Sequence, residues 1–177
     1  LEFRRVLFRS GKRGLAGARI VLQQHMAAAR EGGEAKPKTG ELAVTYSGHG
    51  QPVRGVAFHP DGAEVFSAGN DRKIHRWKIA DGAKTAEVAF GDEVYKLPVG
   101  GGFLFAASAD KSLKQFDAKT QGQVRAYAGA TDAVLTAAYH DATKRVAGGS
   151  FNGEVRIWNA ADGNAIATFV AAPGLKK

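Results

Sequence analysis

The chain contains 177 residues, of which 44% are hydrophobic and 24% are charged, a balance typical of one globular domain. It contains no cysteine, which excludes a disulfide scaffold, a thiolate zinc site and a cysteine nucleophile. The formal net charge is +8, which is compatible with anionic partners but does not establish one. No run of about 18 apolar residues occurs, so the sequence predicts no membrane-spanning helix.

The first ten residues, LEFRRVLFRS, show neither the alternation of a strand nor the apolar stripe of a helix. They also lack the apolar core and cleavage site of a signal peptide. Their back-translation resembles a short-read sequencing adapter along its whole length. We therefore expect residues 1–10 to be adapter-derived and the native sequence to begin near Gly11; a basic N-terminal arm is the alternative.

Residues 11–39 differ in composition from the rest of the chain. Ile20, Val21, Leu22 and Met26 stand among Ala, Gln and Arg, which favours a short helix over residues 18–30. The pair Gly32-Gly33 is expected to end this helix, and a linker is expected to follow up to residue 39.

Three segments of the remaining chain can be laid on one another: residues 65–77, 104–116 and 146–158. Each segment ends in an aromatic residue, and an Asp or Asn stands six positions before it. The aromatic residues recur after 39 and then 42 positions, which indicates a repeat. The repeated positions are Asp71, Asp110 and Asn152, with Trp77, Phe116 and Trp158 closing the units.

Each unit consists of short apolar or alternating runs separated by Gly, Asp and Asn, the pattern of strands and tight turns. The first strands are expected at 53–58, 94–99 and 134–139, and the outer strands at 84–90, 123–127 and 165–170, with one extra outer strand at 41–46. The prediction is an all-β chain of about three four-stranded antiparallel blades, at 48–90, 91–128 and 129–170, preceded by the short helix.

The first unit resembles the WD40 repeat family in order and spacing. The matching residues are Gly48-His49, the run Phe58-His59-Pro60-Asp61-Gly62, Ser67, Asp71 and Trp77. The second unit has Gly91-Asp92 in place of Gly-His, and Phe116 in place of Trp. The third has Gly129-Ala130 and Asn152 but keeps Trp158. The resemblance covers residues 40–177 and implies a β-propeller.

The resemblance also implies a hydrogen-bonded structural tetrad of His49, Ser67, Asp71 and Trp77 within the first blade. Buried imidazole and indole groups need such partners. The second and third units lack several of these residues, so the hydrogen-bonded network is expected to be absent or partial there and to stabilise these blades less. A closed propeller has four to eight blades, and the chain is therefore expected to be the C-terminal part of a longer, bacterial multi-repeat protein with further blades upstream.

Residues with catalytic or metal-binding chemistry do not form a recognisable motif. His59 and His140 occupy the same repeat position but no third ligand recurs with them, so no metal and no cofactor are expected. The Asp residues fall at turns, where side-chain to backbone hydrogen bonds favour them. The basic residues are scattered without an aromatic stacking platform, which makes nucleic-acid binding a minority hypothesis.

These observations predict a non-enzymatic scaffold for protein–protein interaction, whose partners bind the rim loops or the central opening of the propeller. The candidate loops are 48–52, 91–93 and 129–132. The alternative is an accessory propeller of a larger multidomain bacterial enzyme or haem protein. The sequence predicts neither the partner nor the cellular compartment.

Overall fold

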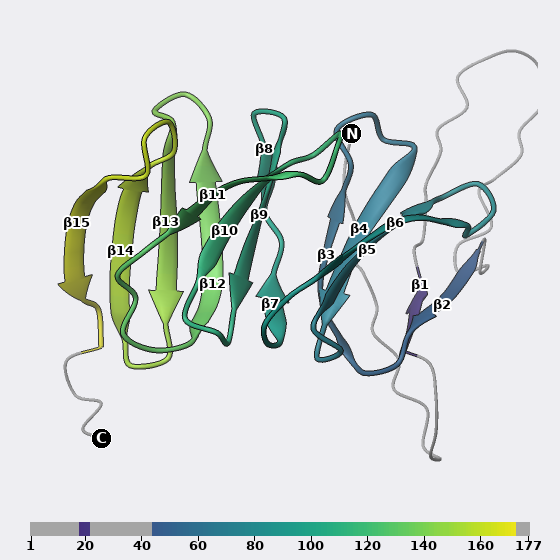
Figure 1. Cartoon of the computed structure of the whole chain (residues 1–177), viewed down its shortest axis with the longest axis horizontal. Coiled ribbons are helices and arrows are strands. Elements are labelled where there is room, and N and C mark those ends of the chain that lie inside the picture. The colour runs from purple at the N-terminus through teal and green to yellow at the C-terminus, as the bar shows by residue number, and fades with distance from the viewer. Residues whose placement is uncertain (1–17, 22–43, 173–177) are drawn as a thin grey trace, which may run out of the picture.

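The structure is a computed structural model, and it describes residues 18–21 and 44–172 (Figure 1). Within these residues the secondary structure consists of fifteen strands, β1 to β15, and contains no helix. The all-β prediction is therefore confirmed. None of the described residues belongs to a helix that could cross a membrane.

The first blade is a four-stranded antiparallel sheet in the order β3-β4-β5-β6. Its strands are β3 (Val53–Phe58), β4 (Glu64–Gly69), β5 (Lys73–Lys78) and β6 (Lys84–Ala89). Gly62 and Gly82 both adopt a φ of 72° in the hairpin turns β3–β4 and β5–β6. That left-handed conformation is open to glycine at little cost, which explains the Asp-Gly pairs seen in the sequence.

The second blade repeats this order with a divided first strand. It contains β7 (Val94–Lys96), β8 (Val99–Gly100), β9 (Phe103–Ser108), β10 (Leu113–Asp117) and β11 (Gln123–Tyr127). The predicted strand 94–99 is interrupted before Pro98, which has no N–H to give to a ladder. The Pro98 carbonyl still accepts a hydrogen bond of 2.9 Å from the Phe105 N–H, so β7 and β8 stay beside β9.

The third blade is the sheet β12-β13-β14-β15. Its strands are β12 (Val134–His140), β13 (Arg145–Ser150), β14 (Glu154–Asn159) and β15 (Ala165–Val170). The prediction of three four-stranded antiparallel blades is thus confirmed.

The predicted helix is wrong where the structure tests it. Residues Ala18–Val21 form the strand β1, which pairs antiparallel with β2 (Thr45–His49). β2 is the extra outer strand, and it lies a few residues beyond the predicted 41–46. Ile20 and Val21 are β-branched and suit a strand once a partner strand is available, so tertiary pairing overrides the helical pattern. The remainder of the predicted helix and the linker lie outside the described residues.

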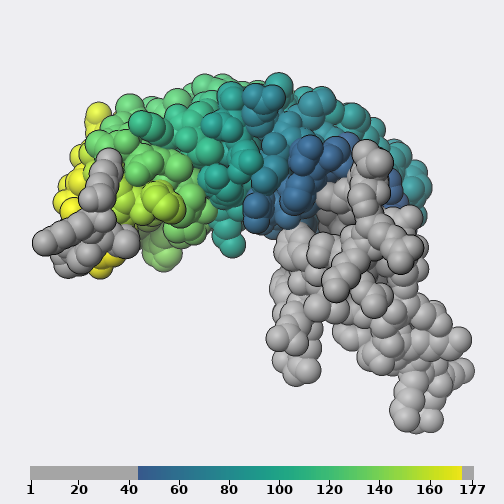
Figure 2. Space-filling view, turned by 90° about the horizontal axis from the view of Figure 1, so that it is seen from below, coloured from purple at the N-terminus to yellow at the C-terminus, as the bar shows by residue number. Residues whose placement is uncertain are grey.

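The blades stack on one another through apolar side chains. Phe66, Ala68 and Ile74 of the first blade pack against Val94 and Leu104 of the second. Phe105, Ala107 and Leu113 of the second blade pack in the same way against the third, where Val146 and Trp158 are buried. The three blades follow one another along a curved body (Figure 2).

One face of the third blade has no neighbouring sheet among the described residues. The cross-strand pairs Ala147–Ile157 and Val155–Phe169 place these four side chains together, on the face opposite Val146 and Trp158. Phe169 is 50% exposed. The corresponding face of the first blade, with Phe66 and Ile74, is fully covered by the second.

Candidate functional site: a buried histidine network and the loop rim

His49 lies at the centre of a buried polar network in the first blade. Its Nδ1 is 2.6 Å from Asp71 Oδ2, and its Nε2 is 2.7 Å from Ser67 Oγ. A carboxylate only accepts hydrogen bonds, so Nδ1 carries the proton and the Ser67 hydroxyl donates to Nε2. The structure therefore brings together three of the four residues of the expected tetrad.

The fourth residue, Trp77, is placed differently. Its indole Nε1 is buried and has no hydrogen-bond partner among the described residues. Its ring instead stacks on Tyr46, with centroids 5.1 Å apart and planes 3° from parallel. Trp77 thus contributes to the network through packing rather than through a hydrogen bond.

Two residues that sequence reasoning missed, Tyr46 and His75, connect Trp77 to His49. The Tyr46 hydroxyl donates to His75 Nδ1 at 2.5 Å, and the His75 ring stacks on His49 at a centroid distance of 4.1 Å. No sequence signal marks His75, because its role depends on which strands become neighbours.

Burial determines the protonation of this network. His75 is 1% exposed, and its burial, followed by the nearby His49, lowers its pKa to about 4. Burial also raises the pKa of Tyr46 to about 12. The Glu87 carboxylate lies 3.3 Å from His75 Nε2, but this nitrogen makes no hydrogen bond among the described residues. At neutral pH, His75 is therefore an uncharged acceptor for the Tyr46 hydroxyl.

The Asp71–His49–Ser67 geometry is that of a catalytic Ser-His-Asp arrangement, but Ser67 has no exposed surface. A nucleophile must reach its substrate, and this hydroxyl sits between packed strands. The arrangement is therefore suited to holding strands β2, β4 and β5 together rather than to chemistry.

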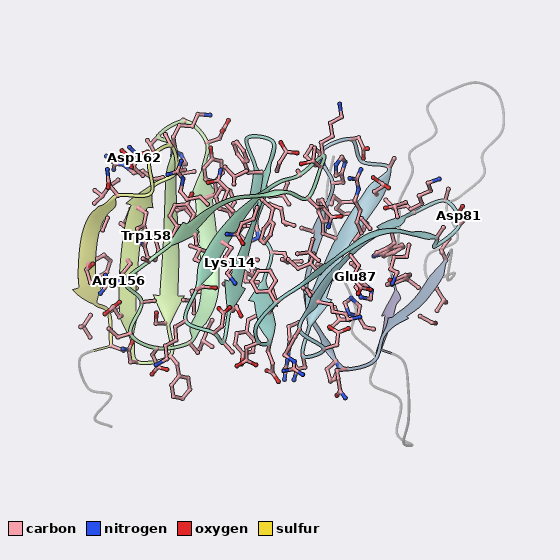
Figure 3. The ribbon with its side chains drawn as sticks, viewed as in Figure 1. Asp81, Glu87, Lys114, Arg156, Trp158 and Asp162 are labelled. Carbon is pink, nitrogen blue, oxygen red and sulfur yellow. The ribbon has the colours of Figure 1, made fainter. Side chains whose placement is uncertain are left out.

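The second and third blades lack the network. Ala106 and Gly148 occupy the position of Ser67, so no hydroxyl is present there. Asp110 instead accepts from the Ser112 N–H at 3.0 Å and pairs with Lys114, 3.0 Å away. Asn152 bonds the Thr131 hydroxyl and the Glu154 N–H. These residues therefore stabilise their own turns. In the alignment of the three units, Lys114 and Arg156 take the position of His75. Figure 3 labels both of these basic residues.

Each closing aromatic residue packs on the aromatic residue that ends the preceding predicted outer strand, 41–46, 84–90 or 123–127. Trp77 stacks on Tyr46, Phe116 contacts Phe90 at 5.7 Å, and Trp158 contacts Tyr127 at 5.7 Å. Trp158 Nε1 also donates to the Ala128 carbonyl at 3.1 Å. A recurring aromatic residue at the end of each outer strand was visible in the sequence and could have predicted these contacts.

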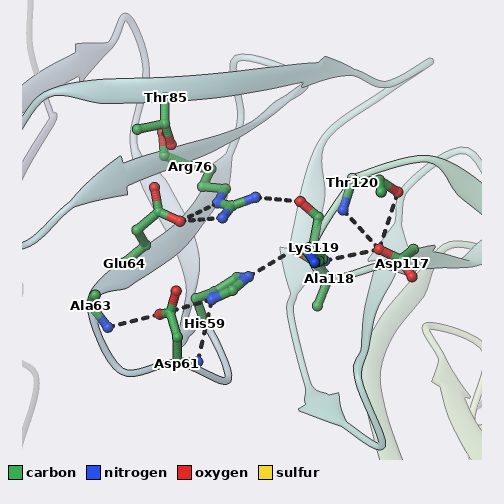
Figure 4. A network of polar contacts seen from close by, with 10 residues as sticks. All are labelled: His59, Asp61, Ala63, Glu64, Arg76, Thr85, Asp117, Ala118, Lys119 and Thr120. Atoms are coloured by element: carbon green, nitrogen blue, oxygen red, sulfur yellow. Dashed lines mark hydrogen bonds and ion pairs between the residues drawn. The ribbon is translucent and has the colours of Figure 1, made fainter.

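A second polar network joins the first two blades at the edge where the β3–β4 and β10–β11 turns lie (Figure 4). Arg76 pairs with Glu64 through Nε at 2.6 Å and donates from Nη1 to the Lys119 carbonyl at 2.6 Å. His59 Nε2 donates to the Ala118 carbonyl at 3.1 Å. The β3–β4 turn is closed by Asp61, whose pKa is held below its usual range chiefly by the Ala63 N–H. The bonds from Arg76 and His59 to the Lys119 and Ala118 carbonyls connect the first blade to the second; we call this network, with Glu64 and Asp61, the latch.

Two groups of described residues bring three potential metal ligands within 4.8 Å of one another: His49, Asp71, His75 and His59, Asp61, Glu64. In the first group both nitrogens of His49 are already hydrogen-bonded, and Tyr46 occupies His75 Nδ1. In the second group Glu64 is paired with Arg76, and His59 Nε2 donates to a carbonyl. Asp71 Oδ1 and His75 Nε2 have no hydrogen-bond partner among the described residues, but neither group offers three free ligand atoms for a metal ion.

The three loops predicted to bind partners lie on one edge of the blades, where β3, β7 and β12 begin; we call this edge the loop rim. Asp92 and Asp132 hold equivalent positions there. Each accepts a hydrogen bond of 2.8 Å from the next backbone N–H, Glu93 or Ala133. These bonds stabilise each loop locally. The loops are held in place by backbone hydrogen bonds, in which the Pro52, Glu93 and Ala133 carbonyls accept from the N–H groups of Asn70, Ala109 and Phe151.

The chain matches the family model described as WD domain, G-beta repeat over residues 40–78 and 121–159. It is 29% identical over 136 residues to transcription initiation factor TFIID subunit 5 of Caenorhabditis elegans, covering 72% of this chain and 20% of that protein. It is 35% identical over 78 residues to Lissencephaly-1 homolog 1 of Paramecium tetraurelia, covering 42% of this chain and 19% of that one.

A solved structure of the RRP9 WD40 repeats superposes with a TM-score of 0.67 at 22% identity, covering 71% of this chain and 41% of that one. The chain thus spans well under half the length of these proteins. The chain contains two matches to the WD40 repeat, at residues 40–78 and 121–159, and its antiparallel four-stranded blades and the His49 network agree with this match.

Proposed function

We propose that this chain is a non-enzymatic scaffold that binds protein partners through its loop rim. The observation that carries the proposal is the burial of its reactive groups: Ser67, His49 and His75 are at most 2% exposed and are used to hold strands together. Loops held on rigid sheets are the usual place for recognition. One relative is itself named as a subunit of a larger assembly, which supports an interaction role.

We further propose that additional blades complete the propeller in the full-length protein. The uncovered face with Val155 and Ile157 supports this, because its counterpart in each preceding blade is covered by the next one. Repeat arrays gain much of their stability from such neighbour interfaces.

Nucleic-acid binding receives no support from the charges. Several basic side chains are paired with carboxylates: Lys73 and Lys84 share Glu87, Arg76 pairs with Glu64, Lys114 with Asp110 and Arg156 with Glu154. A phosphate-binding surface needs unpaired cations. The accessory-module hypothesis requires a catalytic domain elsewhere in the full-length protein, and no described residue favours it.

The proposal is tested by placing a photo-crosslinking amino acid at Gln51 or Thr131, on the loop rim, and at Asp81 or Thr120, on the opposite edge. Crosslinking is carried out in cells that express the full chain. We expect protein adducts from the two rim positions and few from the opposite edge. Adducts of equal yield from both edges, or none from the rim, contradict binding through the rim.

A further inference from the structure

The strand β15 is the outer edge of the third blade, and it differs from the outer edges of the other two blades in carrying no charged residue. Its sequence is Ala-Ile-Ala-Thr-Phe-Val, whereas β6 contains Lys84 and Glu87 and β11 contains Arg125. Charged side chains and proline commonly protect an exposed sheet edge from pairing with another chain. The edge of β15 has neither.

The same strand also concentrates exposed apolar surface. Ile166, Phe169 and Val170 are 48%, 50% and 58% exposed. The other exposed large hydrophobic residues in the described part of the chain are spread over two strands and a turn: Val124, Leu135 and Phe151. A short, uncharged edge strand rich in β-branched and aromatic residues is a template for further strand pairing.

The backbone of β15 offers free hydrogen-bonding groups on its outer side. The Ala171 N–H donates to the Gly153 carbonyl at 2.8 Å, so the backbone groups of Ala171 point toward β14. Inward and outward residues alternate in an antiparallel ladder, so those of Phe169 also point toward β14. The N–H and C=O groups of Thr168 and Val170 therefore point outward, where no strand of the described residues pairs with β15 (Figure 1).

This arrangement is self-complementary about Phe169. When two copies of β15 lie antiparallel with Phe169 opposite its copy, Thr168 of each faces Val170 of the other, and these residues exchange their free backbone hydrogen bonds. The two Phe169 rings then meet at a non-hydrogen-bonded position, where opposing side chains come closest and aromatic pairs are favourable. Ala167 faces Ala171 beside the rings, so neither bulk nor charge opposes the pairing.

We propose that this chain forms a homodimer through antiparallel pairing of β15 with β15 of a second copy, which joins two third blades into one continuous sheet. The occupant is a second copy because the strand matches its own hydrogen-bonding groups, aromatic residue and small residues in a single register. The inference goes beyond the scaffold function, since the outer edge of a blade is distinct from the loop rim. One pair of strands buries less surface than a permanent dimer does, so dimerisation depends on protein concentration.

Sedimentation velocity of the full 177-residue chain over a range of concentrations measures the dimer. The variant Thr168→Pro removes the N–H that donates to Val170 of the copy, and proline is tolerated on an edge strand where the N–H faces outward. The matched control is Ala126→Pro on β11. Ala126 pairs with Lys114 as Thr168 pairs with Arg156, and both Ala126 and Thr168 are exposed.

We expect the unmodified chain to dimerise, Thr168→Pro to raise the dimer dissociation constant by about ten-fold or more, and Ala126→Pro to change it by less than about two-fold. Circular dichroism establishes that both variants keep their sheets. A chain that stays monomeric at every concentration, or equal effects of the two prolines, overturns the proposal. Association that Phe169→Glu lowers but Thr168→Pro leaves unchanged also overturns it, because the copies then meet through the uncovered face of the blade.

Disulfide formation tests the register without proline. The chain has no cysteine, so Phe169→Cys places one thiol directly opposite its copy. Non-hydrogen-bonded antiparallel partners have Cα atoms about 4.5 Å apart, which a disulfide can bridge. The controls are Val124→Cys, at a site of similar exposure on β11, and Ile157→Cys, on the same face as Phe169 but on β14.

With oxidised glutathione as the oxidant, we expect Phe169→Cys to form covalent dimers about five-fold faster than either control. Equal rates for Phe169→Cys and Val124→Cys show unspecific collision and overturn the pairing. Equal rates for Phe169→Cys and Ile157→Cys show that the copies stack face to face, which overturns it as well. Adducts at the loop rim are expected whether or not the chain dimerises, so the scaffold function is tested separately.

Discussion

At the residue scale, the first blade is held by a column of rings that ends in a hydrogen-bonded pair. Trp77 stacks on Tyr46, Tyr46 donates to His75, and His75 stacks on His49, which bonds Ser67 and Asp71. All of these rings are nearly inaccessible to solvent. Removing one member leaves the others buried without their partners, so the column is expected to act as a unit.

His49→Ala is expected to destabilise the chain by about 3 kcal/mol and to lower Tm by roughly 5–10 °C, because it leaves Ser67 and Asp71 buried and unpaired. Thermal unfolding followed by circular dichroism measures the change. The control Asp92→Asn lies on an exposed loop and keeps its backbone cap, so its Tm is expected to move by under about 2 °C. An unchanged melt for His49→Ala contradicts the role given to this network.

Stability is expected to fall as pH is lowered from 7 to 4.5, because His75 is buried in its neutral form. Its pKa is about 4 in the folded chain and about 6.5 when unfolded, so between these values the unfolded chain binds more protons. The stabilisation is complete above pH 6.5, and about 2–3 kcal/mol of it is lost by pH 4.5.

His75→Gln keeps a hydrogen-bond acceptor for Tyr46 but cannot titrate. Urea unfolding at pH 7 and pH 4.5 compares it with the unmodified chain. The variant is expected to lose less stability over this range by about 2–3 kcal/mol, since the carboxylates contribute alike to both proteins. Equal losses in the two proteins show that His75 is not the group responsible.

At the element scale, the blades are joined by two kinds of contact, apolar packing between the sheets and the latch of Arg76 with Glu64 and the Lys119 carbonyl. The side chains of Arg76 and Glu64 are only 16% and 11% exposed. An ion pair in such surroundings is costly to break, because the partner left behind is a poorly solvated charge.

Arg76→Gln is therefore expected to cost about 2–3 kcal/mol in the free energy of unfolding. The matched control is Lys144→Gln, because Lys144 pairs with Asp141 at 2.7 Å but both side chains are more than half exposed. That control is expected to cost at most about 0.5 kcal/mol. Chemical denaturation measures the free energy of unfolding of both variants. If Arg76→Gln and Lys144→Gln lower it by a similar small amount, the stabilising role of the latch is contradicted.

The sequence was sufficient for the elements that repeat. The Asp-Gly turns and alternating runs predicted the sheets β3–β6 and β12–β15, because their pattern is local. The strand β1 was missed because its pairing with β2 is a contact across more than twenty residues of sequence, which no local pattern reveals. His49, Ser67 and Asp71 were found through a family resemblance, whereas the Tyr46–His75 hydrogen bond and the stacking of His75 on His49 depend on which strands become neighbours.

At the scale of the whole molecule, the described blades form a curved stack (Figure 2). Among the described residues no sheet covers the outer face of the last blade, and that face is apolar. Ala147, Val155, Ile157 and Phe169 share that face. Exposed apolar faces drive association. The chain is accordingly expected to self-associate in solution when no further blade covers this face.

Phe169→Glu tests this expectation, since it places a charge on the uncovered face. Light scattering of the full chain is expected to show oligomers that Phe169→Glu shifts toward the monomer. The matched control is Val124→Glu on β11, where the side chain is 48% exposed, close to the 50% of Phe169. A sharply melting monomer without either substitution contradicts association through this face.

The central claim is that stacked blades form a stable scaffold which presents the loop rim. Amide hydrogen exchange of the full chain, resolved by residue, measures it most directly. The account predicts slow exchange throughout the inner strands β4, β9 and β13, and rapid exchange in the loops at 50–52, 91–93 and 129–132. Rapid exchange along β9 or β13 would contradict it, because the loops would then have no rigid sheets to hold them.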